Sequence, residues 1–178
     1  LEGELGETLL ASMNSPDYFT VYPPLLQVYF TLSAWLGAGN LMISSIVLKG
    51  FILLAELGSI LLLFHYFRRR GNPAATLIYT LNPLVIVELV GNIHFEAFMI
   101  FGLVLLLTSL SSIWRSTLKN TAGMVVGLFI AICSKLLPLI AVPFLLRRMP
   151  LFRSFTVIMA TSVLVVLSFI PVLVSASG

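Results

Sequence analysis

Long apolar stretches separated by short polar breaks make up most of this chain. The stretches cover residues 22–38, 41–67, 74–91, 94–113, 121–146 and 154–174. An α-helix needs about 20 consecutive apolar residues to cross a bilayer, and most of these stretches reach or approach that length. The pattern predicts an all-α fold over residues 22–178, a polytopic bundle of transmembrane helices with about five to seven membrane segments.

Two of the stretches are expected to be kinked or interrupted. Pro83 is expected to kink the segment 74–91, because proline removes a backbone donor and clashes with the preceding turn. Lys135 and Pro138 interrupt 121–146, which we interpret as two short helices that meet near Lys135.

Composition supports the membrane interpretation. Of the 178 residues, 59% are hydrophobic and 10% are charged, and the mean hydropathy is +1.08. Soluble domains carry about 25% charged residues. A soluble fold of this length could not bury so much apolar surface, whereas lipid solvates the outer faces of a membrane protein. We therefore predict an integral membrane protein whose partner is the lipid bilayer.

Most basic residues cluster in three loops. The clusters are Arg68, Arg69 and Arg70; Arg115 and Lys119; and Arg147, Arg148 and Arg153. Loops rich in Lys and Arg stay on the cytoplasmic side of a membrane, so we place these loops inside. The net charge of +3 does not indicate a nucleic-acid partner, since no aromatic residues interleave with a basic face.

This orientation determines the path of the chain. With the basic loops inside, the turn after 74–91 and Lys135 both lie at the outer face. The segment 41–67 then begins outside, so 22–38 starts and ends outside and is predicted to be an interfacial or re-entrant helix. The alternative is that 22–38 crosses and the loop at Arg68 is external, which places arginines on the disfavoured side.

The beginning of the chain is polar. Residues 1–21 contain Glu2, Glu4, Glu7 and Asp17 and are expected to form the end of an extracytoplasmic loop. The chain does not begin with Met, and it stops shortly after an apolar stretch. We therefore expect a piece of a longer protein, truncated at both ends.

Familiar motifs of soluble enzymes are missing from the sequence. It contains no Walker loop, Rossmann glycine fingerprint, nucleophile elbow or zinc motif. Cys133 is the single cysteine and lies in an apolar stretch, so we expect a small buried hydrophobe rather than a disulfide or a metal ligand.

Ionisable residues within the apolar stretches mark a candidate site, because each costs about 2.5–3.5 kcal/mol to insert into a bilayer. Lys49 and Lys135 are isolated cations of a kind that binds phosphate. Their alternative role is to extend their charged ends to the membrane interface. Glu56, about two turns from Lys49, could pair with it only through an intermediary; the alternative is that Glu56 faces another helix.

His94 and Glu96 lie at the outer end of a predicted helix. Helical geometry separates their side chains by about 200°, so we expect them to reach different groups of one site rather than to pair. Histidine can donate to a phosphate oxygen or move a proton near neutral pH. Glutamate can accept from sugar hydroxyls or hold a divalent cation. The alternative is an interfacial pair that only faces water.

Two irregular segments complete the set of candidates. At Asn82-Pro83 a packing kink is the simpler explanation, with Asn82 satisfying a neighbouring backbone group. Glu88 lies close enough in sequence to His94 to join the same polar cavity. Residues 22–24 suit a helix start, because proline is favoured in the first turn.

Three segments taken together resemble one family. They are Asp17-Tyr18-Phe19-Thr20-Val21-Tyr22-Pro23-Pro24-Leu25-Leu26-Gln27; Asn82-Pro83-Leu84 followed by Glu88 and Gly91-Asn92-Ile93-His94-Phe95-Glu96; and Ser134-Lys135-Leu136-Leu137-Pro138 with Pro143 and Arg147-Arg148. Their order and spacing over residues 14–150 resemble the GT-C superfamily of polyprenyl-phosphate-sugar-dependent glycosyltransferases. The closest similarity is to the bacterial mannosyltransferase-like branch with a Tyr-Pro-Pro motif.

The resemblance implies a hexosyltransferase of the bacterial cytoplasmic membrane. Such an enzyme moves a sugar, here expected to be mannose, from a polyprenyl-phosphate donor to a glycan, lipid or protein acceptor at the extracytoplasmic face, with inversion. It implies no cofactor other than a possible divalent cation. The family's general base lies in the first extracytoplasmic loop, in a part that would precede Leu1, so residues 1–178 alone are predicted to be inactive.

The local chemistry and the resemblance together assign the site residues. Donor and phosphate binding are assigned to Lys49, His94, Glu96 and Lys135. Shaping of the site is assigned to Tyr22, Pro23, Pro24, Gln27, Asn82, Glu88 and Asn92. The family more often has aspartate at the position of Glu96, and the longer side chain implies a slightly larger site.

Two other classes of protein remain open. A transporter or flippase would also place ionisable residues on broken helices, but here they gather at one face rather than at the midplane. A non-catalytic membrane subunit would use them as contacts between helices. Replacing His94 and Glu96 together should abolish sugar transfer in an enzyme and should mainly disturb assembly in a subunit.

Overall fold

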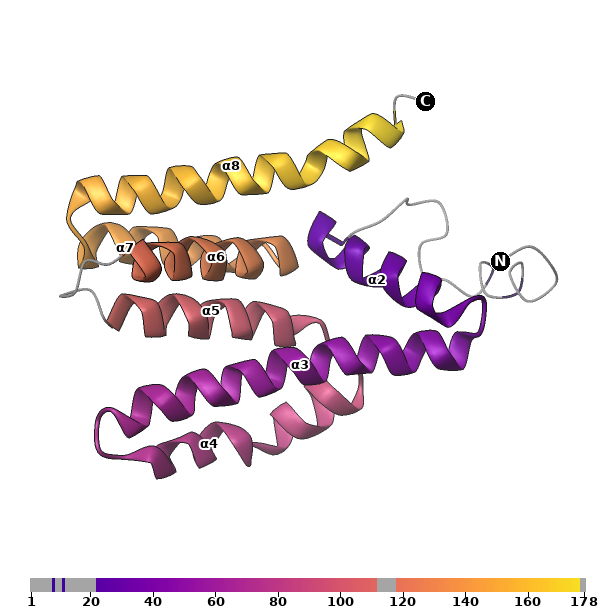
Figure 1. Cartoon of the computed structure of the whole chain (residues 1–178), viewed down its shortest axis with the longest axis horizontal. Helices are drawn as coiled ribbons and strands as arrows, with labels where there is room; N and C mark the ends of the chain where they lie inside the picture. Colours follow the sequence, from indigo (N-terminus) through magenta and orange to yellow (C-terminus); the bar gives the residue numbers. More distant parts are fainter. Residues whose placement is uncertain (1–7, 9–10, 12–21, 112–117, 177–178) are drawn as a thin grey trace.

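The computed structural model describes Thr8, Ala11, residues 22–111 and residues 118–176, with only the backbone described for 172–176. These residues form helices and no strand, which confirms the all-α prediction. Along the chain the elements are α2 (Pro24–Gly37), α3 (Leu41–Arg68), η1 (Pro73–Ala75), α4 (Thr76–Thr80), η2 (Val85–Gly91), α5 (Glu96–Ser111), α6 (Leu118–Ser134), η3 (Leu137–Ile140), α7 (Ala141–Arg148) and α8 (Leu151–Ala176) (Figure 1). The predicted extracytoplasmic loop 1–21 lies outside the described residues except at Thr8 and Ala11.

Two helices are long and apolar enough to cross a membrane. They are Leu41–Arg68 and, within α8, Leu151–Pro171. A third crossing would come from Pro73–Thr80 with Val85–Gly91, a pair bent by 60° at the break that contains Pro83. Many large apolar side chains on the bundle are exposed, which is expected where lipid is the solvent. The protein is therefore a membrane helix bundle.

The shorter helices do not settle the number of crossings. Helices α5 and α6 are apolar and have 16 and 17 residues, or roughly 24–26 Å of length. Helix α2 has 14 residues, about 21 Å, against a hydrocarbon core of about 30 Å. Its interfacial or re-entrant placement fits this length and stays a prediction, as does the count of five to seven membrane segments.

The break predicted at Lys135 is present. Helix α6 ends at Ser134, and the chain turns through η3 into α7, which returns along the bundle. Pro138 lies in the first turn of η3, a position that does not require its missing N–H group. The segment 121–146 is therefore two helices, as predicted.

Close packing of α5 on α6 holds the centre of the bundle together. A Cβ atom on Gly102 would lie 2.5 Å from the Gly127 carbonyl oxygen and 2.6 Å from the Ala131 nitrogen. Only glycine allows the two backbones to approach this closely, a common way for membrane helices to associate. Because of this packing, the start of α5 lies beside the end of α6.

Two apolar clusters fill the bundle on either side of this contact. One includes Leu106, Met124, Leu128, Leu145 and Val157 and joins α5 to α6, α7 and α8. The other includes Leu26, Ile52, Val85, Leu89 and Phe98 and joins α5 to α2, α3 and η2. Helix α5 belongs to both clusters and is thus the central element.

A short turn folds α2 back on α3. Ala38 and Gly39 have positive φ angles of 46° and 84°, and Asn40 then begins α3. The Asn40 side-chain oxygen accepts hydrogen bonds from the backbone nitrogens of Met42 and Ile43, at 3.0 and 3.2 Å. Such a cap satisfies donors that a helix start leaves free, and it fixes the direction in which α3 leaves the turn.

Glu56 faces another helix, which is one of the two alternatives that the sequence left open. It is 3% exposed, in the middle of α3, and its Oε2 accepts a hydrogen bond from the Tyr79 hydroxyl of α4 at 2.8 Å. This contact ties the bent segment α4–η2 to the long helix α3.

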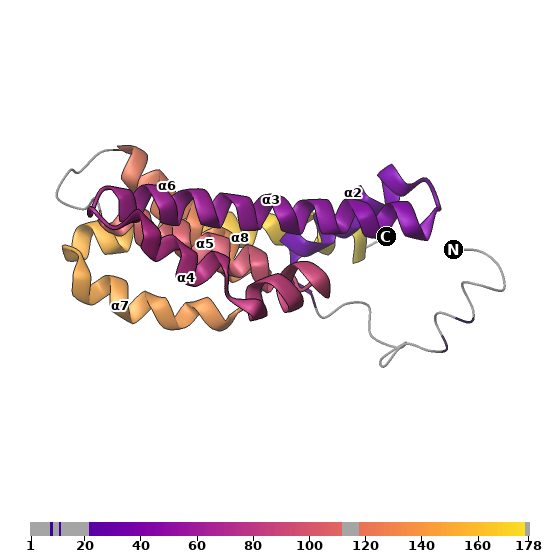
Figure 2. The same ribbon diagram turned by 90° about the horizontal axis from the view of Figure 1, so that it is seen from below.

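One end of the bundle collects the described basic residues of the loops. The end of α3, the start of α6, the end of α7 and the start of α8 lie together there (Figure 1, Figure 2). These termini carry Arg68, Arg69, Arg70, Lys119, Arg147, Arg148 and Arg153. We call this the arginine end; its assignment to the cytoplasmic side stays a prediction from the positive-inside rule.

Candidate active site

A polar pocket forms where three segments meet, away from the arginine end. They are the start of α2, the turn that leads into α5 and the break that follows α6. The pocket has a volume of about 730 Å³. Its lining includes Tyr22, Pro23, Leu26, Asn92, Ile93, His94, Phe95, Glu96, Ser134, Lys135 and Leu136. The three sequence segments singled out above therefore converge in space.

An unusual turn presents His94 to the pocket. Residues 85–91 form a π-helix, and the backbone nitrogens of Asn92 and His94 donate to the carbonyls of Val87 and Leu89, both at 3.0 Å. Ile93 then adopts φ = 57°, a left-handed conformation that costs a β-branched residue about 1–3 kcal/mol. Such π-turns and strained residues concentrate at functional sites.

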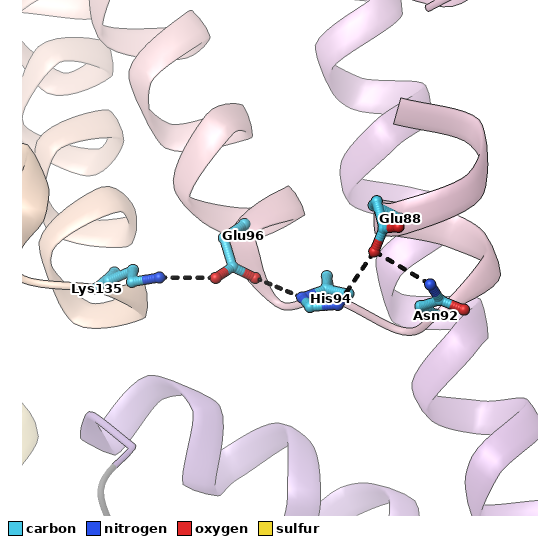
Figure 3. A network of polar contacts seen from close by, with 5 residues as sticks. All are labelled: Glu88, Asn92, His94, Glu96 and Lys135. Atoms are coloured by element: carbon cyan, nitrogen blue, oxygen red, sulfur yellow. Dashed lines mark hydrogen bonds and ion pairs between the residues drawn. The ribbon is translucent and has the colours of Figure 1, made fainter. Parts of the chain in front are cut away.

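Five polar side chains form a continuous network in this region (Figure 3). Lys135 Nζ donates to Glu96 Oε1 at 2.8 Å. Glu96 Oε2 lies 3.3 Å from His94 Nδ1, and His94 Nε2 lies 3.5 Å from Glu88 Oε2. Asn92 Nδ2 also donates to Glu88 Oε2, at 3.1 Å.

The expectation that His94 and Glu96 would not pair is wrong. It assumed that both residues lie on one regular helix. In the structure α5 begins only at Glu96, and the left-handed Ile93 turns the backbone just before His94. The two side chains therefore converge instead of diverging.

Lys135 is also not isolated. It follows the last residue of α6, where its backbone nitrogen donates to the Ala131 carbonyl at 3.1 Å. Its side chain is 55% exposed and that of Glu96 is 33% exposed. The hydrogen bond and the negative charge of Glu96 raise the pKa of Lys135 above its ordinary value, so the lysine is cationic at neutral pH.

The network can both donate and accept hydrogen bonds toward a ligand in the pocket. An ammonium group has three donors, and Lys135 uses one of them on Glu96. Both nitrogens of His94 face carboxylate oxygens, so a neutral imidazole satisfies one contact and an imidazolium satisfies both. The Glu96 carboxylate, which lines the pocket, offers acceptors for hydroxyl groups. This combination suits a ligand with a phosphate and a polyol.

The described residues include no group of three or more histidine, cysteine, aspartate or glutamate side chains placed to hold a metal ion. A divalent cation therefore stays an expectation from the sequence.

Aromatic side chains fix the start of α2 against the His94 turn. The rings of Tyr22, Phe30 and Phe95 meet edge to face, with centroids 5.0 Å apart for Phe30 and Phe95 and 5.2 Å apart for Tyr22 and Phe30. Tyr29 stacks on Phe98 at 4.3 Å. Aromatic pairs of this kind add stabilisation to that gained from burying their apolar surface. The cluster therefore holds the two walls of the pocket together.

Sequence reasoning did not select Phe30, Phe95, Ile93 or Ser134. The sequence did contain a hint for the two aromatic residues. Phe30 follows the segment that begins at Tyr22, and Phe95 lies between His94 and Glu96, on segments already expected at one face. The π-turn had no such signal, because no glycine marks the left-handed residue.

Five of the predicted residues do not line the pocket: Pro24, Gln27, Lys49, Asn82 and Glu88. Glu88 joins the polar network through His94 and Asn92. Gln27 Nε2 donates to the Tyr22 carbonyl at 3.3 Å, and Pro24 is buried in the first turn of α2, so both support the pocket wall. Asn82 Oδ1 accepts from the Leu84 nitrogen at 3.0 Å and caps the kink locally. Lys49 lies on α3 and has no ion-pair partner among the described residues.

Comparison with known protein families gives a match over most of the chain. Residues 16–150, well over half of the chain, match the family described as alpha-(1->6)-mannopyranosyltransferase, N-terminal domain. All residues of the polar network and of the pocket lining fall inside the matched range. Comparisons with curated proteins and with solved structures give no match.

Proposed function

Because the chain belongs to the alpha-(1->6)-mannopyranosyltransferase family, we propose that its polar pocket binds the head group of a polyprenyl-phosphate mannose donor. Membership makes the protein a membrane glycosyltransferase and confirms the mannosyltransferase resemblance. The donor class, the GT-C type, the extracytoplasmic site and the inverting outcome belong to our proposal. The acceptor is a glycan, a lipid or a protein.

The proposed reaction is one displacement. The acceptor hydroxyl attacks the anomeric carbon of mannose, the bond from that carbon to the phosphate oxygen breaks, and polyprenyl phosphate leaves. The configuration at the anomeric carbon inverts, and the hydroxyl proton passes to a general base. We assign that base to none of the pocket residues and place it in the first extracytoplasmic loop, as the family resemblance implies.

In this proposal the pocket residues stabilise the charge of the leaving phosphate and position the donor. Negative charge grows on the leaving phosphate during the displacement, and preorganised donors aimed at such charge contribute most of many enzymes' rate enhancement. Lys135 supplies the cation and the two ammonium donors that Glu96 does not use. His94 lies between Glu88 and Glu96 and holds these carboxylates in position. Glu96 holds Lys135 in place and offers acceptors for the hydroxyl groups of the sugar.

The depth of the pocket in the bundle suits a lipid-linked donor. Helix α5 runs from the pocket to the arginine end over 16 residues, about 24 Å. If the arginines lie at one face of a hydrocarbon core of about 30 Å, the pocket lies near the opposite head-group level. A phosphate there could enter the pocket while its polyprenyl chain stays in lipid.

A single observation carries this proposal: the 2.8 Å ion pair of Lys135 with Glu96, in a pocket of about 730 Å³ inside the family-matched range. A transporter or a subunit has no comparable support from the family match.

Sugar transfer in membranes that contain the complete protein tests the proposal. The donor is labelled polyprenyl-phosphate mannose, and wild type is compared with Glu96→Ala, with Lys135→Ala and with the control Lys119→Ala, which changes a lysine at the arginine end. Label should move to an acceptor in wild type and control, while both site variants insert normally and lose transfer. No transfer from this donor or from its glucose and arabinose equivalents would favour a transporter or a subunit.

A further inference from the structure

A second pocket opens at the arginine end, between α3, α5 and α7. Its volume is about 550 Å³, within the range of about 300–1,000 Å³ typical of small-molecule sites. Apolar side chains such as Leu107 and Phe144 make up much of its wall. Leu107 is 51% and Phe144 is 41% exposed, so the pocket opens toward the lipid-facing surface.

Two arginines from different helices line the same pocket. Arg70 follows α3, and its guanidinium carbon lies 4.2 Å from the ring centre of Tyr66. Arg148 ends α7, and its guanidinium carbon lies 5.4 Å from the ring centre of Phe144. Both rings also line the pocket. Cation–π contacts of this kind hold each guanidinium group in place beside the apolar cavity.

No carboxylate among the residues that the structure describes balances the positive charge of this pocket. The carboxylate residues among those that the structure describes are Glu56, Glu88 and Glu96. Glu56 is bound to Tyr79, the other two belong to the site network, and none of them lines this pocket. The pocket thus combines an apolar cavity with two guanidinium groups, and its complement is an amphiphile with an anionic head.

We propose that this pocket binds an anionic phospholipid of the surrounding bilayer. The phosphate lies between Arg70 and Arg148, which suit bidentate phosphate contacts, and an acyl chain occupies the apolar part lined by Leu107. Basic pockets between membrane helices recognise acidic head groups in this way. The site is separate from the sugar-transfer pocket, since the two lie toward opposite ends of α5.

Lipid retention by the purified complete protein tests this site. The protein is transferred to nanodiscs of phosphatidylcholine with a minor share of phosphatidylglycerol, and the bound lipids are counted by native mass spectrometry. The double variant R70Q/R148Q removes both charges of the pocket. Its matched control R68Q/R147Q removes two neighbouring arginines that do not line the pocket. Each basic side chain near an anionic lipid raises the affinity for that lipid about fivefold. We therefore expect the affinity for phosphatidylglycerol to fall roughly tenfold to thirtyfold in R70Q/R148Q and much less in the control.

A third variant tests the apolar part of the site. Leu107→Trp keeps both arginines but fills the cavity, so it should also lose the preference for phosphatidylglycerol. This variant decides the matter if R70Q/R148Q fails to fold, as judged by gel filtration. Equal losses in R70Q/R148Q and R68Q/R147Q would show only diffuse attraction of acidic lipid and would overturn the proposal, as would full retention in R70Q/R148Q or in Leu107→Trp.

Discussion

Lys135 and Glu96 lie 39 residues apart in sequence, yet their side chains meet at 2.8 Å. The contact joins the end of α6 to the start of α5, two helices that pack without side chains between them at Gly102 and Gly127. The pair is partly exposed, and exposed ion pairs contribute little to stability. Its position in the polar pocket instead points to a role in ligand binding.

Neutralising Lys135 should therefore reduce activity far more than stability. Lys135→Met removes the cation that we propose faces the leaving phosphate, and the loss of one such donor typically lowers the rate by about 10²–10³-fold. Lys135→Arg keeps the charge with a different shape and should retain part of the activity. Transfer assays and thermal unfolding of each variant check this. A large drop in melting temperature with unchanged transfer would contradict it.

The raised pKa of Lys135 gives a prediction for alkaline pH. The stability that this ion pair contributes is fully present below the ordinary lysine value of 10.5 and is lost as pH rises through the higher folded value. Glu96→Gln removes the cause of the shift, so alkaline loss of phosphate binding should begin at lower pH in this variant. Donor binding measured from about pH 8 to pH 12 shows whether the variant loses binding at a lower pH than wild type. Identical alkaline profiles for wild type and variant would contradict it.

Sequence reasoning predicted which polar residues gather at one face of the bundle but not how their side chains are arranged. Topology from the arginine loops placed Tyr22, His94, Glu96 and Lys135 near one face, and the pocket does contain all of them. The same reasoning missed the pairing of His94 with Glu96, because a left-handed Ile93 cannot be foreseen at a β-branched residue. Rules based on local sequence describe regular helices, whereas this pocket depends on a π-helix and a left-handed residue.

The arginine-end pocket shows a second limit of sequence reasoning. The arginines were interpreted as a signal of orientation, which their common location fits. That Arg70 and Arg148 border one cavity depends on how α7 returns beside α3 and α5. Such a contact follows from helix packing over long sequence separations, and no periodicity within one segment reveals it.

The close contact of α5 with α6 should be intolerant of even one methyl group. In Gly102→Ala the new Cβ would lie 2.5 Å from the Gly127 carbonyl oxygen, a backbone atom that cannot move alone. We expect a loss of about 1–3 kcal/mol in stability, as for other overpacked cores. Displacement of α5 should also separate Glu96 from Lys135 and reduce transfer.

Gly50→Ala on α3 is the matched control, because a Cβ atom at that position would have no neighbouring side chain or distant backbone atom within 4 Å. Alanine favours helices over glycine in both variants, so the difference between the two isolates the steric clash. Thermal unfolding in detergent measures it. Equal stabilities of the two variants would show that α5 and α6 can separate without cost.

Substitutions at the buried Glu56 and its half-buried partner Tyr79 should have non-additive effects on stability. Glu56 Oε2 accepts from the Tyr79 hydroxyl, while its Oε1 has no hydrogen-bond partner among the described residues. Tyr79→Phe leaves the buried carboxyl group without its donor, which should cost about 1–3 kcal/mol. The double variant Glu56→Leu/Tyr79→Phe removes both polar groups and should be less destabilised than Tyr79→Phe alone, because no buried acceptor is left unsatisfied. Unfolding free energies of the two single variants and the double variant give the coupling energy between the two side chains. A double variant that loses as much stability as the two single variants together would contradict this interaction.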